Sequence, residues 1–331
     1  MGYRVLIIGG IGYLGYNLAL EHSSGGDVVY IAARKSSAQR RRRLFGELKQ
    51  LAEKVLLTST LQDPADIQGS IDSIGCPDIA YMAVGKLTGR PEELMEANAI
   101  IPKKWAEALA RRCSNTLYVY ISNTLAVGDA GDCAENNHVA EEHQHLKGCR
   151  PVGPHSRSKM EGERNVMNIC RRTRLSVAIL RPGLLVGRWC YHEEWRLLYR
   201  LAKLHIRLRG GPILHATPAR DIAVASRILR DHMGGKLCGW FYATPWRGDL
   251  GELHEMLLRH LGVKHYIPLP VPRPPRGKVP SFFKVLAEYS VQQHFVFKPR
   301  ALEVFGMEWR SIDEAVREAA EWLKNYMGKK H

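Results

Sequence analysis

The chain has 331 residues, of which 45% are hydrophobic and 24% are charged. This length and balance are typical of a folded globular protein and exclude a low-complexity or disordered chain. No apolar run approaches the roughly 18 residues of a spanning helix, so we expect no membrane span, and the glycines after the first apolar run argue against a secretory signal. The 48 Lys and Arg against 33 Asp and Glu give a net charge of +15, which favours an anionic partner such as a phosphorylated cofactor.

The cysteines and the arginines narrow the class of protein further. Seven cysteines, an odd number without a CxxC pair, predict neither a disulfide framework nor a zinc site, and a reducing cytoplasm is the simplest compartment. The arginine run 40–43 is typical of a solvated helix face, and contact with a cofactor phosphate is the alternative. We expect no nucleic-acid partner, because the sequence has no RNA-binding aromatic signature, zinc finger or basic zipper.

The first half of the chain alternates short β-branched runs with helical stretches. The strand-like runs are 5–8, 28–32, 55–58, 79–83, 117–121 and 177–180. Segments 102–112 and 159–172 have the length and apolar spacing of crossover helices. This alternation predicts an α/β fold with a doubly wound parallel sheet.

The pattern loosens from about residue 188. An arginine-rich stretch, a proline run from 268 to 280 and a final amphipathic helix over 312–326 follow. We therefore predict a dinucleotide-binding domain over 1–187 and a smaller mixed substrate-binding domain over 188–331, partly interleaved with the first.

A glycine motif follows the first predicted strand. Gly9, Gly12 and Gly15 form a GxxGxxG pattern that leads into a helix over 16–22. Glycines there permit a tight turn and let a pyrophosphate approach the helix N-terminus, where unpaired N–H groups attract anions. The alternative is that the glycines only allow close helix packing.

Further motifs give the sequence a family resemblance over nearly its whole length. They are Asn98, Arg181-Pro182-Gly183-Leu184-Leu185-Val186-Gly187, Arg220-Asp221-Ile222-Ala223, and a closing pattern from Pro299 through Gly306 to Trp322. With the glycines, they make the chain similar to the extended short-chain dehydrogenase/reductases of the NAD-dependent epimerase/dehydratase superfamily. The resemblance implies a Rossmann-type fold and a nicotinamide dinucleotide cofactor.

The end of the second strand indicates which dinucleotide binds. An acidic residue there would bind the ribose 2′-hydroxyl of NAD, whereas a cation accepts the 2′-phosphate of NADP. The position holds Ala33, and Arg34 and Lys35 follow. We therefore expect NADP rather than NAD, with the alternative that Arg34 is exposed and stacks on adenine.

The resemblance implies further contacts with the cofactor. Tyr13 and Leu14 belong to the glycine loop, Thr60 and Leu61 would lie beside the adenine, Met82 and Ala83 would face the ribose and diphosphate, and Pro182 and Leu185 would follow the sixth strand. Lys86 would point toward the substrate.

The resemblance also implies a catalytic set made of a hydroxyl after the fifth strand and a YxxxK pair on the next helix. Thr124 aligns with the hydroxyl, and Ser122 is the second choice. Lys159 matches the lysine, but His155 stands in place of the tyrosine. An imidazole beside the Lys159 ammonium is expected to be neutral with a lowered pKa. His155 then transfers the proton itself, or another group does so, or the site binds dinucleotide without turnover.

Three other features have two interpretations each. A cluster of His138, Glu141, Glu142, His143 and His145 is a metal site or a solvated loop, and we expect no metal because its spacing fits no common template. Segment 192–195 with Arg196 lines the substrate entrance or packs internally. The helix that carries Trp105 forms a dimer seam, as the resemblance implies, or faces the sheet.

These observations predict an NADP-dependent oxidoreductase acting on a carbonyl or alcohol carbon of a small molecule, as a homodimer. Thr124 would orient the substrate oxygen, His155 would act as acid or base, and Lys159 would hold the nicotinamide ribose. The alternatives are a sugar-nucleotide epimerase or dehydratase, and a non-catalytic NADP-binding sensor or scaffold.

Overall fold

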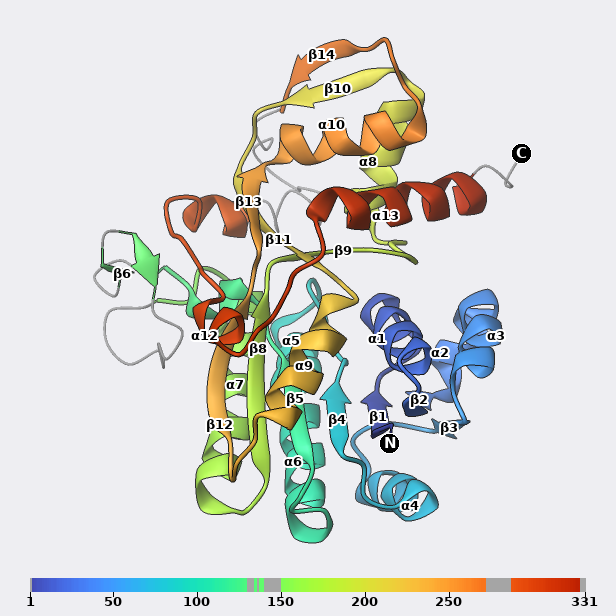
Figure 1. Ribbon diagram of the computed structural model, residues 1–331, viewed down its shortest axis with the longest axis vertical. Coiled ribbons are helices and arrows are strands. Elements are labelled where there is room, and N and C mark those ends of the chain that lie inside the picture. The colour runs from blue at the N-terminus through green and yellow to red at the C-terminus, as the bar shows by residue number, and fades with distance from the viewer. Residues whose placement is uncertain (1, 130–133, 136, 140–149, 272–286, 328–331) are drawn as a thin grey trace.

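A seven-stranded parallel sheet forms the body of the protein (Figure 1). The computed structural model describes residues 2–129, 134–135, 137–139, 150–271 and 287–327. In sheet order the strands are β12 (Cys238–Ala243), β8 (Ser176–Pro182), β5 (Leu117–Ile121), β4 (Ile79–Met82), β1 (Arg4–Ile8), β2 (Val28–Arg34) and β3 (Lys54–Thr58). The order reverses between β1 and β4, which is where a doubly wound sheet binds its ligand.

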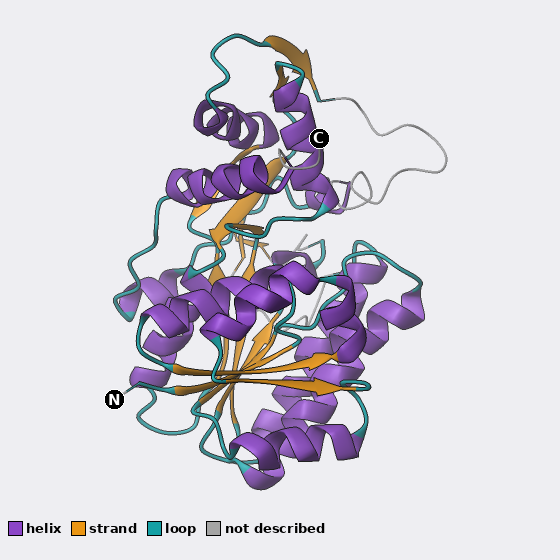
Figure 2. Ribbon diagram, turned by 90° about the vertical axis from the view of Figure 1, so that its right-hand side faces the viewer, coloured by secondary structure: helices purple, strands orange, loops and turns teal. Residues whose placement is uncertain are grey.

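Helices cover both faces of the sheet (Figure 2). Successive side chains of a strand point to opposite faces, so Ile7 joins one core cluster and Leu6 the other. The first face packs against α1 (Tyr13–Ser24), α3 (Arg42–Leu51) and α9 (Asp221–Asp231), and the second against α4 (Pro64–Ile74), α6 (Ile101–Arg112) and α7 (Pro154–Arg172). Burial on both sides explains why the strands read as continuous apolar runs.

The predicted parallel sheet is confirmed, and one strand is added to it. All six predicted runs are strands, with β8 extending to Pro182. The seventh strand, β12, pairs with β8 after the chain has passed through the smaller lobe. The sequence gives no clear signal for β12, because half of its residues are only partly buried and the run lacks β-branched residues.

The smaller lobe stands above the carboxyl ends of the main strands (Figure 1). Its sheet consists of β13 (Trp246–Asp249), β11 (Ile213–Pro218) and β9 (Leu184–Val186), and β10 (Ile206–Arg209) pairs with β14 (Ile267–Pro270). Its helices are α8 (Glu193–Lys203), α10 (Leu250–Leu261) and α13 (Ile312–Met327). The first prolines of the predicted connector thus lie in β14, and the run from 272 to 280 lies outside the described residues.

The remaining elements are short. They are α2 (Lys35–Arg40), α5 (Pro91–Met95), the π-helical turn η1 (Glu96–Ile100), the 3-10 turn η2 (Thr124–Val127), β6 (Ala134–Glu135), β7 (His138–Val139) and α12 (Arg300–Val304). Within the described residues, no helix combines the length and apolar composition needed to cross a bilayer.

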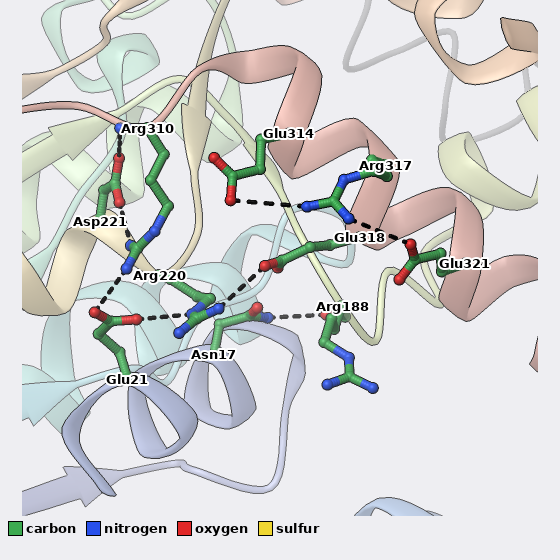
Figure 3. Close-up of polar contacts among 10 residues, drawn as sticks. All are labelled: Asn17, Glu21, Arg188, Arg220, Asp221, Arg310, Glu314, Arg317, Glu318 and Glu321. Carbon is green, nitrogen blue, oxygen red and sulfur yellow. Dashed lines mark hydrogen bonds and ion pairs between the residues drawn. The ribbon is translucent and has the colours of Figure 1, made fainter. Parts of the chain in front are cut away.

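A network of ion pairs ties the final helix segment to the body (Figure 3). Glu21 of α1 pairs with Arg220 and with Arg310, each at 2.7 Å. Arg310 also pairs with the buried Asp221, and Arg220 reaches Glu318 of α13 at 3.0 Å. The network joins α1, the start of α9 and α13, three elements that are far apart in sequence.

Two disulfides contradict the prediction that the cysteines form none. Cys76 pairs with Cys113 and Cys170 pairs with Cys238. Cys76 precedes β4 and Cys113 caps the C-terminal end of α6, whereas Cys170 lies in the last turn of α7 and Cys238 begins β12. Only the tertiary structure therefore brings the partners together. Cys190 is free and buried, and the cysteines at 133 and 149 lie outside the described residues.

Candidate active site

A cleft of about 410 Å³ opens at the carboxyl ends of β1, β2, β4, β5 and β8. The glycine loop lies at one side, and residues from the smaller lobe close the other. This position follows from the fold, because the loops after parallel strands meet at one edge of the sheet.

The glycine loop is shaped to receive an anion. Gly9 has a positive φ of 81°, and a Cβ there would lie 2.6 Å from the Val84 side chain, so turn geometry and packing both require glycine. A Cβ on Gly15 would meet the backbone of Gly10 at 2.2 Å, which fixes the close packing of α1 on the loop.

Gly12 differs from these two glycines because the chain itself does not crowd it. A Cβ at Gly12 would make only ordinary contacts, the nearest at 3.6 Å, so its missing side chain keeps the cleft open. Gly12 is also the N-cap of α1, with no side-chain cap and no acidic residue in the first turn. The free N–H groups and the helix dipole therefore fit a dinucleotide pyrophosphate.

Three guanidinium groups line the same end of the cleft. Arg34 ends β2, and Arg40 and Arg41 follow at the end of α2. Arg41 donates to the Ile11 carbonyl at 2.5 Å, and its guanidinium lies 4.9 Å from the Tyr191 ring centre. The arrangement concentrates positive charge beside the second strand, where a ribose 2′-phosphate of NADP would lie.

His155 is buried at the start of α7 and lines the cleft. Its Nδ1 lies 2.9 Å from the carbonyl oxygen of Lys86, and its Nε2 has no hydrogen-bond partner among the described residues. Burial and the nearby Lys159 ammonium lower the pKa of His155 to about 3. The ring is therefore neutral at pH 7, as expected from the sequence, with a bare Nε2 because Nδ1 must carry the proton that the carbonyl accepts.

Lys159 lies one turn further along the same face of α7. Its ammonium is buried and donates to the Ile121 carbonyl at 2.8 Å. Burial lowers the pKa of Lys159 to about 8, and the Glu163 charge opposes this shift. The four-residue spacing, about one helical turn, thus places the His155 imidazole and the Lys159 ammonium together in the cleft.

Glu163 occupies the next turn and anchors the floor of the site. It accepts from Ser122 Oγ at 2.5 Å, from Arg181 at 2.6 Å and from the Trp240 indole at 3.1 Å. The side chains of Glu163 and Arg181 are completely buried. The Ser122 hydroxyl proton is thereby directed to Glu163, which leaves the Ser122 oxygen available as an acceptor.

Most of the residues predicted from sequence meet in this cleft. Those that line it are Gly9, Gly12, Tyr13, Leu14, Gly15, Arg34, Leu61, Ala83, Lys86, Ser122, His155, Lys159, Pro182 and Leu185. Four predicted residues, Lys35, Thr60, Met82 and Thr124, are not among the lining residues; Met82 is buried in the core beneath the cleft and Thr124 is buried in η2.

Sequence reasoning missed several lining residues. Asn123 lines the cleft beside Ser122, and its amide donates to the Tyr289 hydroxyl at 3.3 Å. Burial raises the pKa of Tyr289 to about 12. Asn123 could have been predicted, because it adjoins Ser122 in the motif. Tyr289 comes from a segment without a recognisable sequence pattern.

The structure locates residues of the three features for which the sequence left two interpretations. His192, Glu194 and Trp195 line the cleft or its extension into the smaller lobe. Trp105 is buried and donates its indole N–H to the Leu61 carbonyl at 2.9 Å, so it faces the sheet. His138 lies in β7, and the other four members of the histidine and carboxylate cluster lie outside the described residues.

The comparisons with known proteins establish the family. The sequence matches the family described as the NAD dependent epimerase/dehydratase family over residues 5–213. The chain therefore belongs to that family. None of the curated proteins matches the sequence.

Solved structures share the fold along the whole chain. The Bordetella bronchiseptica enzyme WbmG in complex with NAD superimposes with a TM-score of 0.73 at 17% identity, covering 98% of this chain and 95% of that one. A dTDP-glucose 4,6-dehydratase from Bacillus anthracis with NAD gives 0.73 at 13% identity, with coverages of 98% and 97%. A UDP-N-acetylglucosamine 4-epimerase from Methanobrevibacter ruminantium gives 0.71 at 14% identity, with coverages of 98% and 99%.

Proposed function

We propose that the chain is an NADP-dependent oxidoreductase that moves hydride between the dinucleotide and a carbonyl or alcohol carbon. The observation that carries this proposal is the cleft end where the uncapped α1 meets the three guanidinium groups. Ala33 stands where an acidic residue would select NAD. Cations around a 2′-phosphate and no carboxylate at that position favour NADP.

The chain's own residues take separate roles in this proposal. The dinucleotide, when bound, donates or accepts the hydride. The Lys159 ammonium would hold the nicotinamide ribose, and the bare Nε2 of His155 would take the proton of a substrate hydroxyl as the alcohol is oxidised to the carbonyl. For the hydroxyl that orients the substrate oxygen we favour Ser122 over Thr124, because Ser122 lines the cleft. In this role its hydroxyl proton would turn from Glu163 to donate to the substrate oxygen.

A sugar-nucleotide epimerase or dehydratase is the second candidate function. Family membership and the neighbours named for UDP- and dTDP-sugar chemistry support it. The two candidates differ in stoichiometry, because an epimerase returns the hydride to its substrate whereas an oxidoreductase converts one dinucleotide per turnover. A net change in dinucleotide absorbance upon turnover distinguishes them.

Calorimetric titration with NADPH and NADH tests the cofactor assignment. We expect tighter binding of NADPH, and we expect Arg34→Ala to remove most of this preference. Arg42→Ala is the matched control, since Arg42 is exposed on α3 and does not line the cleft. Equal affinity for the two dinucleotides, or a preference that survives Arg34→Ala, contradicts NADP selection at this end of the cleft.

Turnover separates the enzyme from the non-catalytic sensor. A sensor binds NADP⁺ but reduces none of it with any member of a panel of primary alcohols, secondary alcohols and sugar nucleotides. We expect turnover with at least one alcohol and a loss of at least about tenfold in His155→Phe, since that change removes the Nε2 that takes the hydroxyl proton as hydride leaves the carbon.

The homodimer is proposed from the family resemblance, with α6 and α7 as its seam. The outward side chains there include ion pairs such as Lys103 with Glu107 at 3.9 Å and Arg164 with Glu161 at 3.8 Å. Sedimentation velocity at about 0.1 M and 1 M salt tests it, because a polar seam weakens with screening.

A cytoplasmic location is likewise proposed, and two disulfides in a cytoplasmic protein are typical of hyperthermophilic organisms.

A further inference from the structure

The cleft continues into a second cavity of about 430 Å³, which lies between the main sheet and the smaller lobe of the protein. The two parts share several lining residues, including Lys86, Leu184, Tyr191 and Tyr289. We call this extension the inner lobe. A ligand that occupies it therefore reaches the part of the cleft where His155 and Lys159 lie.

The walls of the inner lobe are mainly apolar. Leu198 and Leu214 contribute side chains that are 1% and 2% exposed, and Leu250 adds one that is 2% exposed. Leu184, Tyr191 and Tyr289 complete the wall toward the cleft. Burial of apolar ligand surface against such walls is favourable by about 25 cal/mol per Å².

The charges at the inner lobe oppose a nucleotide diphosphate. Among the described lining residues, Lys86 carries a positive charge, and Glu193 and Glu194 carry negative ones. The Lys86 ammonium already pairs with Glu93 at 2.7 Å. A diphosphate would thus meet the Glu193 and Glu194 carboxylates, the second of them 3.3 Å from His192, and an ammonium that is already paired. The arginines that would suit it lie at the dinucleotide end of the cleft.

One polar group in the wall lacks a partner. Trp195 is completely buried and lines the inner lobe, and its indole Nε1 has no hydrogen-bond partner among the described residues. An indole nitrogen only donates, and a buried donor without an acceptor costs about 1–3 kcal/mol. A ligand oxygen would remove that cost.

We propose that the inner lobe binds an uncharged carbonyl or alcohol compound with an apolar body, and that the Trp195 indole donates to an oxygen of that compound. This inference rests on the proposed oxidoreductase function and specifies its substrate class. It also distinguishes this chain from relatives whose names refer to sugar nucleotides.

The test uses the full chain saturated with oxidised dinucleotide, NADP⁺ or NAD⁺, whichever binds. The probes are 4-phenyl-2-butanone, an uncharged ketone, and UDP, and neither can accept hydride from the oxidised dinucleotide. Titration calorimetry is expected to show ketone binding at least about tenfold tighter than UDP binding. The saturation step separates the two proposals, because failure to bind any dinucleotide overturns the proposed function before the inner lobe is probed.

Two variants locate the ketone site. Trp195→Phe keeps an aromatic side chain but removes the indole N–H, and we expect it to weaken ketone binding about tenfold, the equivalent of one hydrogen bond. Trp309→Phe is its matched control, because Trp309 also has an unpartnered indole nitrogen but does not line the inner lobe. Leu214→Glu should abolish ketone binding, and Leu204→Glu, at a site 66% exposed, should not.

Dinucleotide affinity should stay unchanged in Trp195→Phe, which shows that the variant is folded. Tighter binding of UDP than of the ketone overturns the inference, as does the absence of ketone binding to the saturated protein. Ketone binding that is insensitive to both Trp195→Phe and Leu214→Glu also overturns it.

Discussion

The Nδ1 atom of His155 lies 2.9 Å from the main-chain carbonyl oxygen of Lys86. Asn98 holds the same carbonyl, donating to it at 2.9 Å, and accepts from the Lys86 N–H at 3.1 Å. Asn98 itself belongs to the π-helical turn η1, a distortion that is frequent at functional sites. Asn98 thus fixes the loop at Lys86, and the Lys86 carbonyl in turn sets the tautomer of His155. The imidazole therefore presents Nε2 as an acceptor.

The buried, neutral state of His155 predicts an acid-sensitive fold. The pKa of His155 falls to about 3 in the folded protein, so the unfolded chain binds one more proton between about pH 6.5 and pH 3. Stability therefore rises with pH through this window and is lost as pH falls, with a slope of up to about 1.4 kcal/mol per pH unit. Urea unfolding between pH 4 and 8 measures the slope of the unfolding free energy against pH. In His155→Gln this slope should correspond to about one proton fewer than in the wild type.

His215 and His254 are buried as well, and burial lowers the pKa of each to about 4. Because of these two histidines, the free energy of unfolding of His155→Gln should still depend on pH. The exposed His232 provides the control, so His232→Gln should retain the full slope of the wild type. An unchanged slope in His155→Gln would show that folding does not lower the pKa of this ring.

Lys159 predicts how dinucleotide binding depends on pH. Burial lowers the pKa of Lys159 to about 8, so the ammonium is present below that pH and is lost above it. NADPH affinity should therefore fall between pH 7 and 9.5, because the neutral amine no longer attracts the ribose and phosphate oxygens. Lys159→Met should bind about tenfold more weakly at pH 7 and show no such fall. A fall of the same size in Lys159→Met would assign the titration to another group.

The disulfide between Cys170 and Cys238 should stabilise the pairing of β8 with β12. It closes a loop with a sequence separation of 68, for which chain entropy gives about 4 kcal/mol. The double variant Cys170→Ala/Cys238→Ala should lose a large part of this free energy of unfolding and melt several degrees lower under oxidising conditions. Addition of a reductant should lower the melting temperature of the wild type, and it should change the double variant less. Equal effects on both proteins would refute a stabilising role for this bond.

Arg310 should be the most sensitive member of the ion-pair network. It pairs with Asp221, whose side chain is 1% exposed, and with Glu21 at 2.7 Å. Arg310→Met leaves the Asp221 carboxylate buried without its guanidinium, at a cost of about 3 kcal/mol in the free energy of unfolding. Arg317→Met is the control, because Arg317 is 52% exposed and forms only surface pairs, each contributing at most about 1 kcal/mol. A similar loss in both variants would show that the network adds nothing beyond surface pairing.

Local sequence patterns were sufficient to predict the layout of the body. Strand-length apolar runs with intervening helices predict a parallel sheet, and Gly9, Gly12 and Gly15 predict the tight turn that we propose as the pyrophosphate site. The HxxxK spacing places His155 and Lys159 on one helical face. Each of these conclusions rests on local periodicity or on a conformation that only glycine permits, and both are visible in a short stretch of residues.

Features that join distant segments could not be predicted from local patterns, because they depend on how the chain packs. The disulfide of Cys76 with Cys113 forms because neighbouring strands bring the two cysteines together, and their spacing in the sequence gives no sign of it. The Lys86 carbonyl that fixes the His155 tautomer, and the inner lobe containing Trp195 and Leu214, likewise join segments that no local pattern connects. Burial sets the pKa of the imidazole, and burial is a property of the packed molecule.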